Sequence, residues 1–477
     1  MAVFEAYDEH DAIGLADLVK RGEVSAADLL ETAIERVEQR NPIINAMSQN
    51  LFDHGREAIR NGLPEGPFRG VPFLLKDAAG DLAGYPTTNG ARLLKHDVAK
   101  ADSTIIERYK AAGLVIFGKT TTPEFSLAAS TETSLTGATR NPWDRGRVAG
   151  GSSGGAAAVV AAGIVPAAHG SDGGGSIRIP ASCCGLFGMK PTRARNPSGP
   201  KIGEGWGSLS VAHVLTRSVR DSAAMLDVTQ GMAPGDPYCA PARNRPFLDE
   251  VTTPPGKLRI GYQTLPVSGA YVAEPCRQAA EEAVKLLTSL GHEVEQVSLP
   301  GDWQVLQQSL WVLVATNIAR SIGVLADKRG SPILPSEVDR VTWNAIESAY
   351  KMTAYEYAVA LHSIHHQSRL MAAVHEKFDI ILSPTVATLP PKLGVHHTDT
   401  DDIGVYGAAL AAFSPFTQMF NITGAPSMSV PLHWTEEGLP VGVMMSAPFG
   451  REGMLFRLAG QLEAERPWFH RRPDLQG

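Results

Sequence analysis

Residues 150–180, GGSSGGAAAVVAAGIVPAAHGSDGGGSIRIP, contain two serines that each lie within a run of glycines. Glycine loses more backbone freedom on folding than any other residue, so a dense glycine run indicates a backbone that turns tightly or closely approaches a ligand. The Ala/Val-rich stretch 156–162 between the two runs has the length of a short buried helix. The segment therefore predicts a turn, a helix, a connection and a second turn, with Ser152 and Ser176 able to lie at one site.

A third candidate residue, Lys76, lies near the end of the apolar run 70–77, GVPFLLKD. Short apolar runs bounded by glycine and proline are typical of buried strands. A lysine at the end of such a strand either extends its amine to solvent or is a desolvated amine with a lowered pKa that acts as a general base. The two glycine-flanked serines favour the second interpretation.

The sequence 150–154 also matches the G-x-S-x-G turn of α/β-hydrolases, with Ser152 at its centre. That turn follows a strand and works with a later Asp and His. Here Arg145 and Arg147 precede the turn, and no downstream histidine stands out. An α/β-hydrolase-type esterase with Ser152 as its nucleophile is therefore a weaker alternative.

Three separated motifs, in this order along the chain, resemble the amidase signature family. The motifs are GVPFLLKD at 70–77, GGSSGG at 150–155 and SDGGGSIRIPASCCGLFGMKPTR at 171–193. The resemblance covers most of the chain, and it is greatest to the branch of nylon-oligomer (cyclic aminohexanoate dimer) hydrolases, through GATRNPW at 137–143 and CCGLFG at 183–188. One departure is Gly173, where many members carry a bulkier residue.

The resemblance implies an α/β fold with a single large mixed β-sheet covered by helices on both faces, and a Ser–cis-Ser–Lys triad. Carried over by position, Ser176 is the nucleophile, Ser152 the bridging serine with a cis peptide bond, and Lys76 the base. The matched motifs contain no histidine, so neutral Lys76 would take the proton of Ser176 through Ser152. The implied reaction is amide hydrolysis through an acyl-enzyme, with no cofactor and no metal.

The residues around Ser176 have further expected roles. Glycines beside the nucleophile offer N–H groups without side chains, which suits an oxyanion hole. The expected donors are Gly173, Gly174, Gly175 and Ser176. Asp172 and Arg178 flank the nucleophile, and we interpret both as structural residues that hold the loop by hydrogen bonds and charge.

The substrate is less well defined by the sequence. The residues that match a family segment lining the acyl pocket are small or apolar: Ser126, Leu127, Ala128 and Ala129. Together with aromatic residues in 304–376, they favour a neutral, fairly hydrophobic amide, although esters, anilides and carbamates (urethanes) need the same chemistry. Trp206, in the Gly/Pro-rich loop 194–207, either closes over a bound hydrophobic group or packs into the core.

A second alternative function is the A subunit of a tRNA-dependent amidotransferase, which has a similar length and the same triad. That subunit usually carries a Ser-x-Asp-Gln-x-Gly-Pro segment after the triad region. Residues 207–217, GSLSVAHVLTR, lack it. The sequence therefore favours an independent hydrolase.

His396 and His397, with Asp399, Asp401 and Asp402, form either a metal site or an exposed polar loop. The spacing is neither helical nor that of a zinc finger. The sequence therefore favours the exposed loop.

The composition is that of a large globular enzyme. The chain has 477 residues, of which 43% are hydrophobic and 19% charged. A net charge of −7 gives no electrostatic footprint for nucleic acid. The first residues lack the features of a signal peptide, the apolar run 156–168 falls short of a membrane span, and the 4 cysteines form no CxxC pair. We expect a cytoplasmic monomer or homodimer that acts on a small-molecule amide, without nucleic-acid or membrane partners.

Strand-like and helical runs alternate along the chain, which favours a mixed sheet covered by helices. Strands are expected at 71–75, 114–117, 258–262, 380–383 and 427–431. Ser25 and Asp28 resemble a capping box that opens a helix. We expect one amidase domain over 1–477, with an N-terminal helical region at 1–68 and a helical insertion at 304–376 that covers the core.

Overall fold

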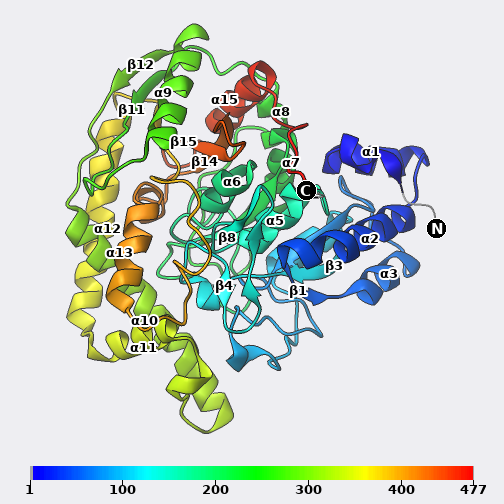
Figure 1. Cartoon of the computed structure of the whole chain (residues 1–477), viewed down its shortest axis with the longest axis horizontal. Helices are drawn as coiled ribbons and strands as arrows, with labels where there is room; N and C mark the ends of the chain where they lie inside the picture. The colour runs from blue at the N-terminus through cyan, green and yellow to red at the C-terminus, as the bar shows by residue number, and fades with distance from the viewer. Residues whose placement is uncertain (1–3, 476–477) are drawn as a thin grey trace.

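The structure is a computed structural model of the whole chain, and it describes residues 4–475. Within them, eleven strands form one mixed sheet that is surrounded by helices (Figure 1). The strands of this sheet follow one another in the order β1-β3-β2-β8-β10-β9-β14-β15-β13-β11-β12. The pairs of β2 with β3 and β8, and of β11 with β12 and β13, are parallel, and the other pairs are antiparallel. The expected α/β fold with one large mixed sheet is confirmed.

The strands of the large sheet are short, and most are buried. Their bounds are β1 Met47–Asn50, β2 Pro72–Lys76, β3 Val115–Thr120, β8 Ala167–Asp172, β9 Phe187–Lys190, β10 Val211–Thr216, β11 Arg259–Tyr262, β12 Glu293–Gln296, β13 Ile380–Pro384, β14 Ser427–Trp434 and β15 Pro440–Ser446. Two small ladders join β4 Glu132–Thr133 to β5 Gly137–Ala138, and β6 Arg140–Asn141 to β7 Asp144–Val148.

Helices surround the sheet along the whole chain. The first group is α1 Ala12–Arg21, α2 Ala26–Ile44, α3 Phe52–Arg60, α4 Thr104–Ala111, α5 Gly154–Ala161, α6 Arg178–Cys184, α7 Val219–Thr229 and α8 Phe247–Val251. The second group is α9 Glu274–Ser289, α10 Trp303–Arg329, α11 Arg340–Lys351, α12 Ala354–His375, α13 Ile403–Phe413, α14 Met419–Ile422 and α15 Glu452–Glu465. Short 3₁₀ turns lie at Glu5–Glu9, Arg92–Leu94, Glu124–Ser126 and Pro335–Glu337.

All five strands expected from apolar runs are confirmed, as β2, β3, β11, β13 and β14. The expected connection within 150–180 was wrong in part, because it contains the central strand β8. The sequence of β8, AAHGSD, has no β-branched residue, and every position is buried, so neither propensity nor alternation marks it. Such central strands have no sequence signal of their own.

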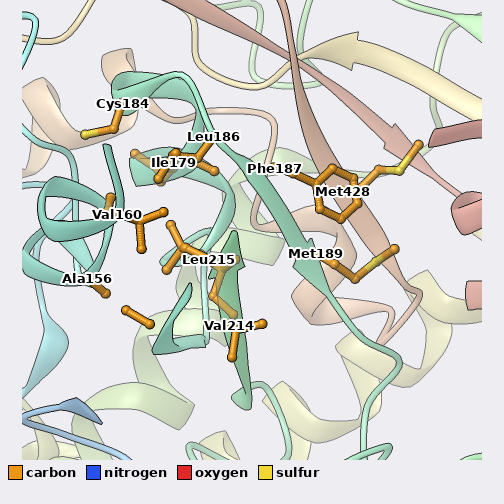
Figure 2. Close-up of a cluster of buried hydrophobic side chains, with 14 of the residues drawn as sticks. Ala156, Val160, Ile179, Cys184, Leu186, Phe187, Met189, Val214, Leu215 and Met428 are labelled. Atoms are coloured by element: carbon orange, nitrogen blue, oxygen red, sulfur yellow. The ribbon is translucent and has the colours of Figure 1, made fainter. Parts of the chain in front are cut away.

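Local signals at helix ends behave as the sequence predicts. The hydroxyl of Ser25 accepts a hydrogen bond from the N–H of Asp28 at 3.0 Å, and α2 begins at the next residue, Ala26. Helix α5 begins at Gly154, two residues before the expected Ala/Val-rich stretch, ends at Ala161 and is buried on every side. Its Ala156 and Val160 belong to the apolar core that β9 and β10 share with α6 (Figure 2). This packing holds the two glycine-rich turns on a rigid base.

Helices α10 to α13 lie together at one end of the molecule, and α1 to α3 lie at the other (Figure 1). In the described part of the chain one helix, α10, is long and apolar enough to cross a membrane by length and composition alone. Here α10 packs against α11 and α12, and residues such as Leu313 and Ile318 are buried in the core. These contacts bury one part of α10 against the rest of the protein.

Candidate active site

Lys76 is the last residue of β2, and its side chain is completely buried. Its Nζ lies 2.7 Å from Oγ of Ser152 and 3.0 Å from Oγ of Ser171. Burial lowers the pKa of Lys76 to about 7, although the nearby Asp172 carboxylate opposes part of this shift. A large fraction of this amine is therefore neutral near neutral pH, as a general base requires.

Ser152 lies in a turn that packs directly against the backbone of residues 130–131. The peptide bond between Gly151 and Ser152 is cis, as the resemblance implied. A Cβ atom on Gly151 would lie 2.2 Å from the carbonyl oxygen of Ser130, so only glycine fits there. The hydroxyl of Thr131 accepts from the N–H of Gly154, the first residue of α5, at 3.1 Å. The glycine run is therefore explained by close backbone packing.

Ser176 follows β8 and is almost fully buried. Its carbonyl oxygen accepts from the N–H of Ser153 at 3.2 Å, which joins the two glycine-rich turns. Among residues 4–475 the structure records no hydrogen bond of the Ser176 hydroxyl, which leaves it free to turn toward a substrate. Catalytic hydrogen bonds often form only when the substrate is bound. The structure thus brings Lys76, Ser152 and Ser176 into one site.

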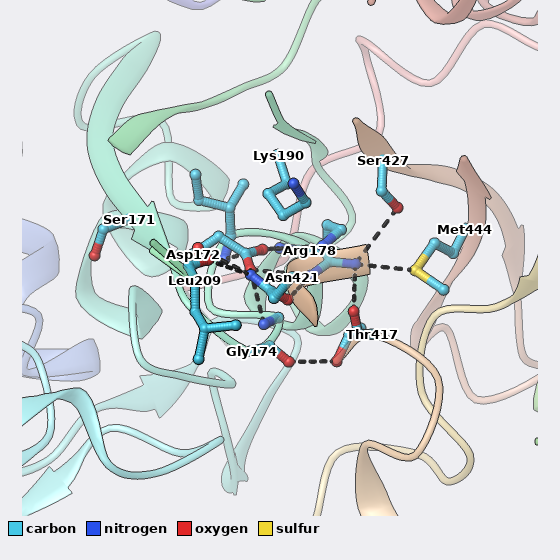
Figure 3. Close-up of polar contacts among 12 residues, drawn as sticks. Ser171, Asp172, Gly174, Arg178, Lys190, Leu209, Thr417, Asn421, Ser427 and Met444 are labelled. Atoms are coloured by element: carbon cyan, nitrogen blue, oxygen red, sulfur yellow. Dashed lines mark hydrogen bonds and ion pairs between the residues drawn. The ribbon is translucent and has the colours of Figure 1, made fainter. Parts of the chain in front are cut away.

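A buried ion pair between Asp172 and Arg178 spans the nucleophile loop (Figure 3). Nη2 and Nε of Arg178 lie 2.9 Å and 3.0 Å from the two carboxylate oxygens. Burial alone would raise the pKa of Asp172, but the guanidinium outweighs it and holds this pKa well below its ordinary value. The same carboxylate accepts from the N–H of Ile177 at 3.1 Å, so it also shapes the loop.

The N–H of Gly175 donates to Oδ1 of Asp172 at 2.8 Å. This group is therefore already used within the protein, which contradicts the expectation that Gly175 is a free oxyanion donor. The candidate donors that remain are Gly173, Gly174 and Ser176. The sequence could not show this, because Gly175 is equivalent to its neighbours in composition.

Sequence reasoning missed three polar residues that complete the loop. Nδ2 of Asn421 donates to Asp172 at 2.9 Å, and the hydroxyl of Thr417 donates to the carbonyl of Gly174 at 2.6 Å (Figure 3). The third residue is Ser171, whose hydroxyl accepts a hydrogen bond from Nζ of Lys76, as the hydroxyl of Ser152 also does. Ser171 stands inside the matched motif and could have been noticed there. Asn421 and Thr417 lie far along the chain, where no spacing rule connects them to the nucleophile.

Trp206 packs against the nucleophile loop at the position where the sequence departs from the family pattern. A Cβ atom on Gly173 would lie 2.7 Å from Cε3 of Trp206, so the indole occupies the space that a side chain would take. Trp206 is half-buried, and the loop 194–207 that carries it contains no helix or strand of the main sheet. Its neighbour Gly207 lies close to Leu313 of α10.

Residues 126–129 form a turn that contacts helices α11 and α13. Ser126 has a positive φ of 61° and forms the end of a tight turn. The carbonyl of Leu127 accepts from the hydroxyl of Tyr406 in α13 at 2.7 Å. Ala128 packs against Val341 and Tyr406 in a small apolar cluster. Ala129 is buried in the main core, and the expected role of this segment in lining the acyl pocket stays a prediction.

The segment after residue 395 is exposed at Asp399, Asp401 and Asp402, as expected, but His396 differs. His396 is buried, and its ring centroid lies 5.6 Å from that of Phe413 and 6.4 Å from that of Tyr406. Among residues 4–475, no group of three or more His, Cys, Asp or Glu side chains is arranged to hold a metal ion. His396 is therefore part of the apolar packing of α13.

Comparisons with known proteins agree with this site. The Amidase family model matches residues 28–456. The 6-aminohexanoate-cyclic-dimer hydrolase of Pseudomonas sp. (strain NK87) is 38% identical over 478 residues, which cover 98% of this chain and 96% of that protein. A solved structure of a 6-aminohexanoate cyclic dimer hydrolase matches with a TM-score of 0.93 and 36% identity, covering 99% of this chain and 100% of that one. A bacterial aryl acylamidase of the amidase signature family matches with a TM-score of 0.87 and 27% identity, covering 96% of each chain.

The fold and the site define a hydrolase of amide C–N bonds. The chain belongs to the amidase family, also called the amidase signature family, and resembles its cyclic-dimer hydrolases most among the relatives described above. These similarities favour this class over an α/β-hydrolase-type esterase and over an amidotransferase subunit.

Proposed function

We propose that this protein hydrolyses neutral, largely apolar amides through an acyl-enzyme on Ser176. The single observation that carries the proposal is the state of Lys76. Its amine is completely buried, has a pKa lowered to about 7, and lies 2.7 Å from the hydroxyl of Ser152. A serine hydroxyl is a weak nucleophile and needs such a base within reach.

The proposed reaction passes one proton along the triad. Neutral Lys76 accepts the proton of Ser152 while Ser152 accepts that of Ser176, whose Oγ attacks the amide carbon. The oxyanion is held by N–H groups of Gly173, Gly174 and Ser176. The proton then returns from Lys76 through Ser152 to the leaving amine. Water hydrolyses the acyl-enzyme with the same proton path in the second half of the reaction.

Charge pairing around the nucleophile supports a neutral substrate. Asp172 and Arg178 neutralise each other, and the guanidinium of Arg193 donates to the carbonyls of Ser208 and Ile422. The ion pair of Asp172 and Arg178 therefore offers no unpaired charge to a substrate, and the guanidinium of Arg193 is turned to backbone carbonyls. An ionised substrate group would lose its water without gaining a partner, which is costly in a buried site.

An apolar contact surface supports the same substrate class. The half-buried ring of Trp206 lies over Gly173, beside the nucleophile, and Leu313 approaches Gly207 from α10. The relatives named above are a hydrolase of the 6-aminohexanoate cyclic dimer and an aryl acylamidase. We propose that anilides and cyclic or linear aliphatic amides are substrates here, and that esters and carbamates react by the same acyl-enzyme chemistry.

We further propose that residues 1–477 act as one amidase domain, in which 1–68 form an N-terminal helical region and 304–376 form a helical insertion over the core. The proposed setting is the cytoplasm, with the protein a monomer or homodimer that needs no cofactor, metal, nucleic acid or membrane. The net charge of −7 supports the absence of a nucleic-acid partner.

A hydrolysis panel tests the function. Purified protein alone should release product from an acetanilide, from the cyclic dimer of 6-aminohexanoate or from hexanamide, and a phenyl ester and a phenyl carbamate extend the panel. Ser176→Ala is the matched inactive control. Activity that appears only after adding tRNA, ATP and partner subunits would contradict the proposal and favour the amidotransferase. Hydrolysis of esters but of no amide would contradict the assignment as an amidase.

A further inference from the structure

A cavity of about 410 Å³ lies where α8 meets α15. Figure 1 shows these two helices beside each other. Its walls come from residues 241–250 with 255 and from residues 449–457. None of these residues belongs to the triad, the nucleophile loop or the segments 126–129 and 194–207. The cavity is therefore a second candidate site that amide hydrolysis does not use.

The lining of this cavity is strongly unbalanced in charge. Four arginines face one carboxylate: Arg243, Arg245, Arg451 and Arg457 lie around Glu250. Arginine carries a fixed positive charge at any working pH and presents its N–H donors in a planar fork that matches carboxylate and phosphate groups. A wall of this kind recognises an anion.

Glu250 neutralises only part of that charge. Its Oε2 accepts from Nη2 of Arg245 at 2.6 Å and from Nε of Arg457 at 2.5 Å. Burial would raise the pKa of Glu250, but these two guanidinium hydrogen bonds outweigh it and lower this pKa. The single carboxylate of Glu250 thus pairs with both Arg245 and Arg457. Each of these guanidinium groups has further N–H donors that are not bonded to Glu250.

The other two arginines differ in their partners. Arg243 forms an ion pair with Asp227, which stands behind the wall and does not line the cavity. Arg451 is exposed and makes no ion pair with any residue of the described range 4–475. Arg451 is also the N-cap residue of α15, whose first residue, Glu452, is buried and paired with Arg195.

The two walls are fixed to one another in advance. Gly450 has a positive φ of 81°, and a Cβ atom there would lie 3.0 Å from Cγ of Pro241 on the other wall. Buried Arg195 donates to Glu452 at 2.8 Å and to the carbonyl of Pro241 at 2.6 Å. The two walls are therefore joined by the buried Arg195, in addition to the ion pair of Arg457 with Glu250.

We propose that this cavity binds a small organic anion. The arginines hold a carboxylate or phosphate group, and the apolar body of the ligand lies against Phe247 and Phe449, of which Phe449 is 46% exposed. The volume lies in the range of sites for organic ligands, about 300–1,000 Å³. A bare phosphate ion would leave most of it unfilled.

Calorimetric titration of the full-length protein tests this proposal at constant ionic strength. The probes are phenyl phosphate, 3-phenylpropionate, inorganic phosphate and neutral 3-phenylpropanol. At least one of the two aromatic anions should bind, more tightly than inorganic phosphate, and the neutral alcohol should not. The preferred anion identifies the source as a phosphate or a carboxylate. No binding of either aromatic anion, or equal binding of the alcohol, would overturn the proposal.

Charge variants locate the binding. Arg451→Glu and Arg457→Ala should each lower the affinity for the aromatic anion by about tenfold or more. Arg369→Glu, at an exposed position on α12, should leave this affinity unchanged. Arg451 has no partner to lose, so its variant tests the site even if Arg457→Ala is unstable. Equal affinity in the wild type and in Arg451→Glu would place the anion elsewhere, for example in the active site, and would overturn the proposal.

Discussion

The nucleophile loop, residues 171–178, and the segment 194–207 that packs over it are close in the chain but are held in different ways. In the loop, Asp172 and Arg178 are buried and paired, and backbone N–H groups are fixed by the same carboxylate. The segment 194–207 has exposed residues at 201–203, and it is held by scattered contacts: a hydrogen bond from Thr104 to Gly199, an ion pair of Lys201 with Asp81 and an isolated bridge between Gly205 and Ser210.

This difference separates two kinds of effect on the enzyme. The loop and the triad behind it determine the chemical step, which every substrate shares. Under the proposed function, Trp206 and the helices beside it contact the part of the substrate that varies. Substitutions in the first region should therefore lower activity toward all substrates alike, and those in the second should change the ranking of substrates.

The largest effect is expected at the nucleophile. Ser176→Ala should lower kcat by roughly 10⁴–10⁶-fold for every substrate, because no acyl-enzyme can form. Covalent labelling by a serine-directed phosphonate should disappear while the thermal unfolding midpoint changes little. Labelling that persists in Ser176→Ala but is lost in Ser152→Ala would instead favour Ser152 as the nucleophile.

Lys76→Ala should have the next largest effect, about 10²–10⁴-fold in kcat, since it removes the proposed base. Lys76→Arg should not restore activity, because a guanidinium cannot be deprotonated in proteins. EDTA should change nothing, and a loss of activity that zinc restores would contradict a metal-free mechanism. The measurement is kcat against pH for the wild type and both variants.

The pH dependence follows from the same residue. Burial lowers the pKa of Lys76 to about 7. Below that pH the amine is protonated and cannot accept a proton, so activity should be low there and rise as pH increases through 7. A rate that falls as pH rises through this range would contradict neutral Lys76 as the base.

The buried ion pair should show its effect in stability. Arg178→Met would leave the carboxylate of Asp172 buried without its partner, and should cost about 3–5 kcal/mol in the free energy of unfolding. Arg277→Met is the matched control, because Arg277 pairs with Glu274 and Glu281 at the surface of α9, where such pairs contribute about 0–1 kcal/mol. Urea unfolding measures both, and equal losses would contradict the prediction.

The free energy of unfolding at low pH tests the ion pair of Asp172 and Arg178 a second time. The pKa of Asp172 is depressed in the folded protein, so its contribution to stability is present above the ordinary carboxyl pKa of about 4 and is lost as pH falls below it. Arg178→Met should therefore lose less stability between pH 5 and pH 3 than the wild type does, as measured by urea unfolding at each pH.

The sequence could predict those features that depend on a short local stretch of the chain. Lys76, Ser152 and Ser176 each lie in a short local motif, so residue types and spacing identified them. β2 and β13 are continuous apolar runs and were predicted for that reason. Where function depends on contacts between distant segments, a single sequence has no comparable signal.

Gln307 and Gln418 illustrate that limit. They are hydrogen-bonded to each other and connect α10 to the nucleophile loop, because Cγ of Gln418 is the nearest atom to a Cβ built on Gly174, at 3.8 Å. More than a hundred residues separate them in the chain, and neither stands in a motif. The mixed sheet could be expected from alternation, but the pairing that brings these residues together depends on tertiary packing.

The smallest expected effect lies at the contact between the two regions. Gly173→Ala would place a Cβ atom 2.7 Å from Cε3 of Trp206, so the indole must move. Overpacking of this kind costs about 1–3 kcal/mol, and the same cost in the transition state would lower kcat/KM by about 5–150-fold. Trp206→Ala alone should change KM and the ranking of anilides against aliphatic amides, with kcat for the smallest amide nearly unchanged.

The double variant Gly173→Ala with Trp206→Ala should recover part of the loss of Gly173→Ala, because the clash is gone and the effects of contacting residues are not additive. A double-mutant cycle in kcat/KM measures this coupling, and thermal unfolding is recorded for each variant. Strictly additive effects, or a large drop in thermal stability of Trp206→Ala with unchanged kinetics, would show that the indole only packs the core and that the two regions act independently.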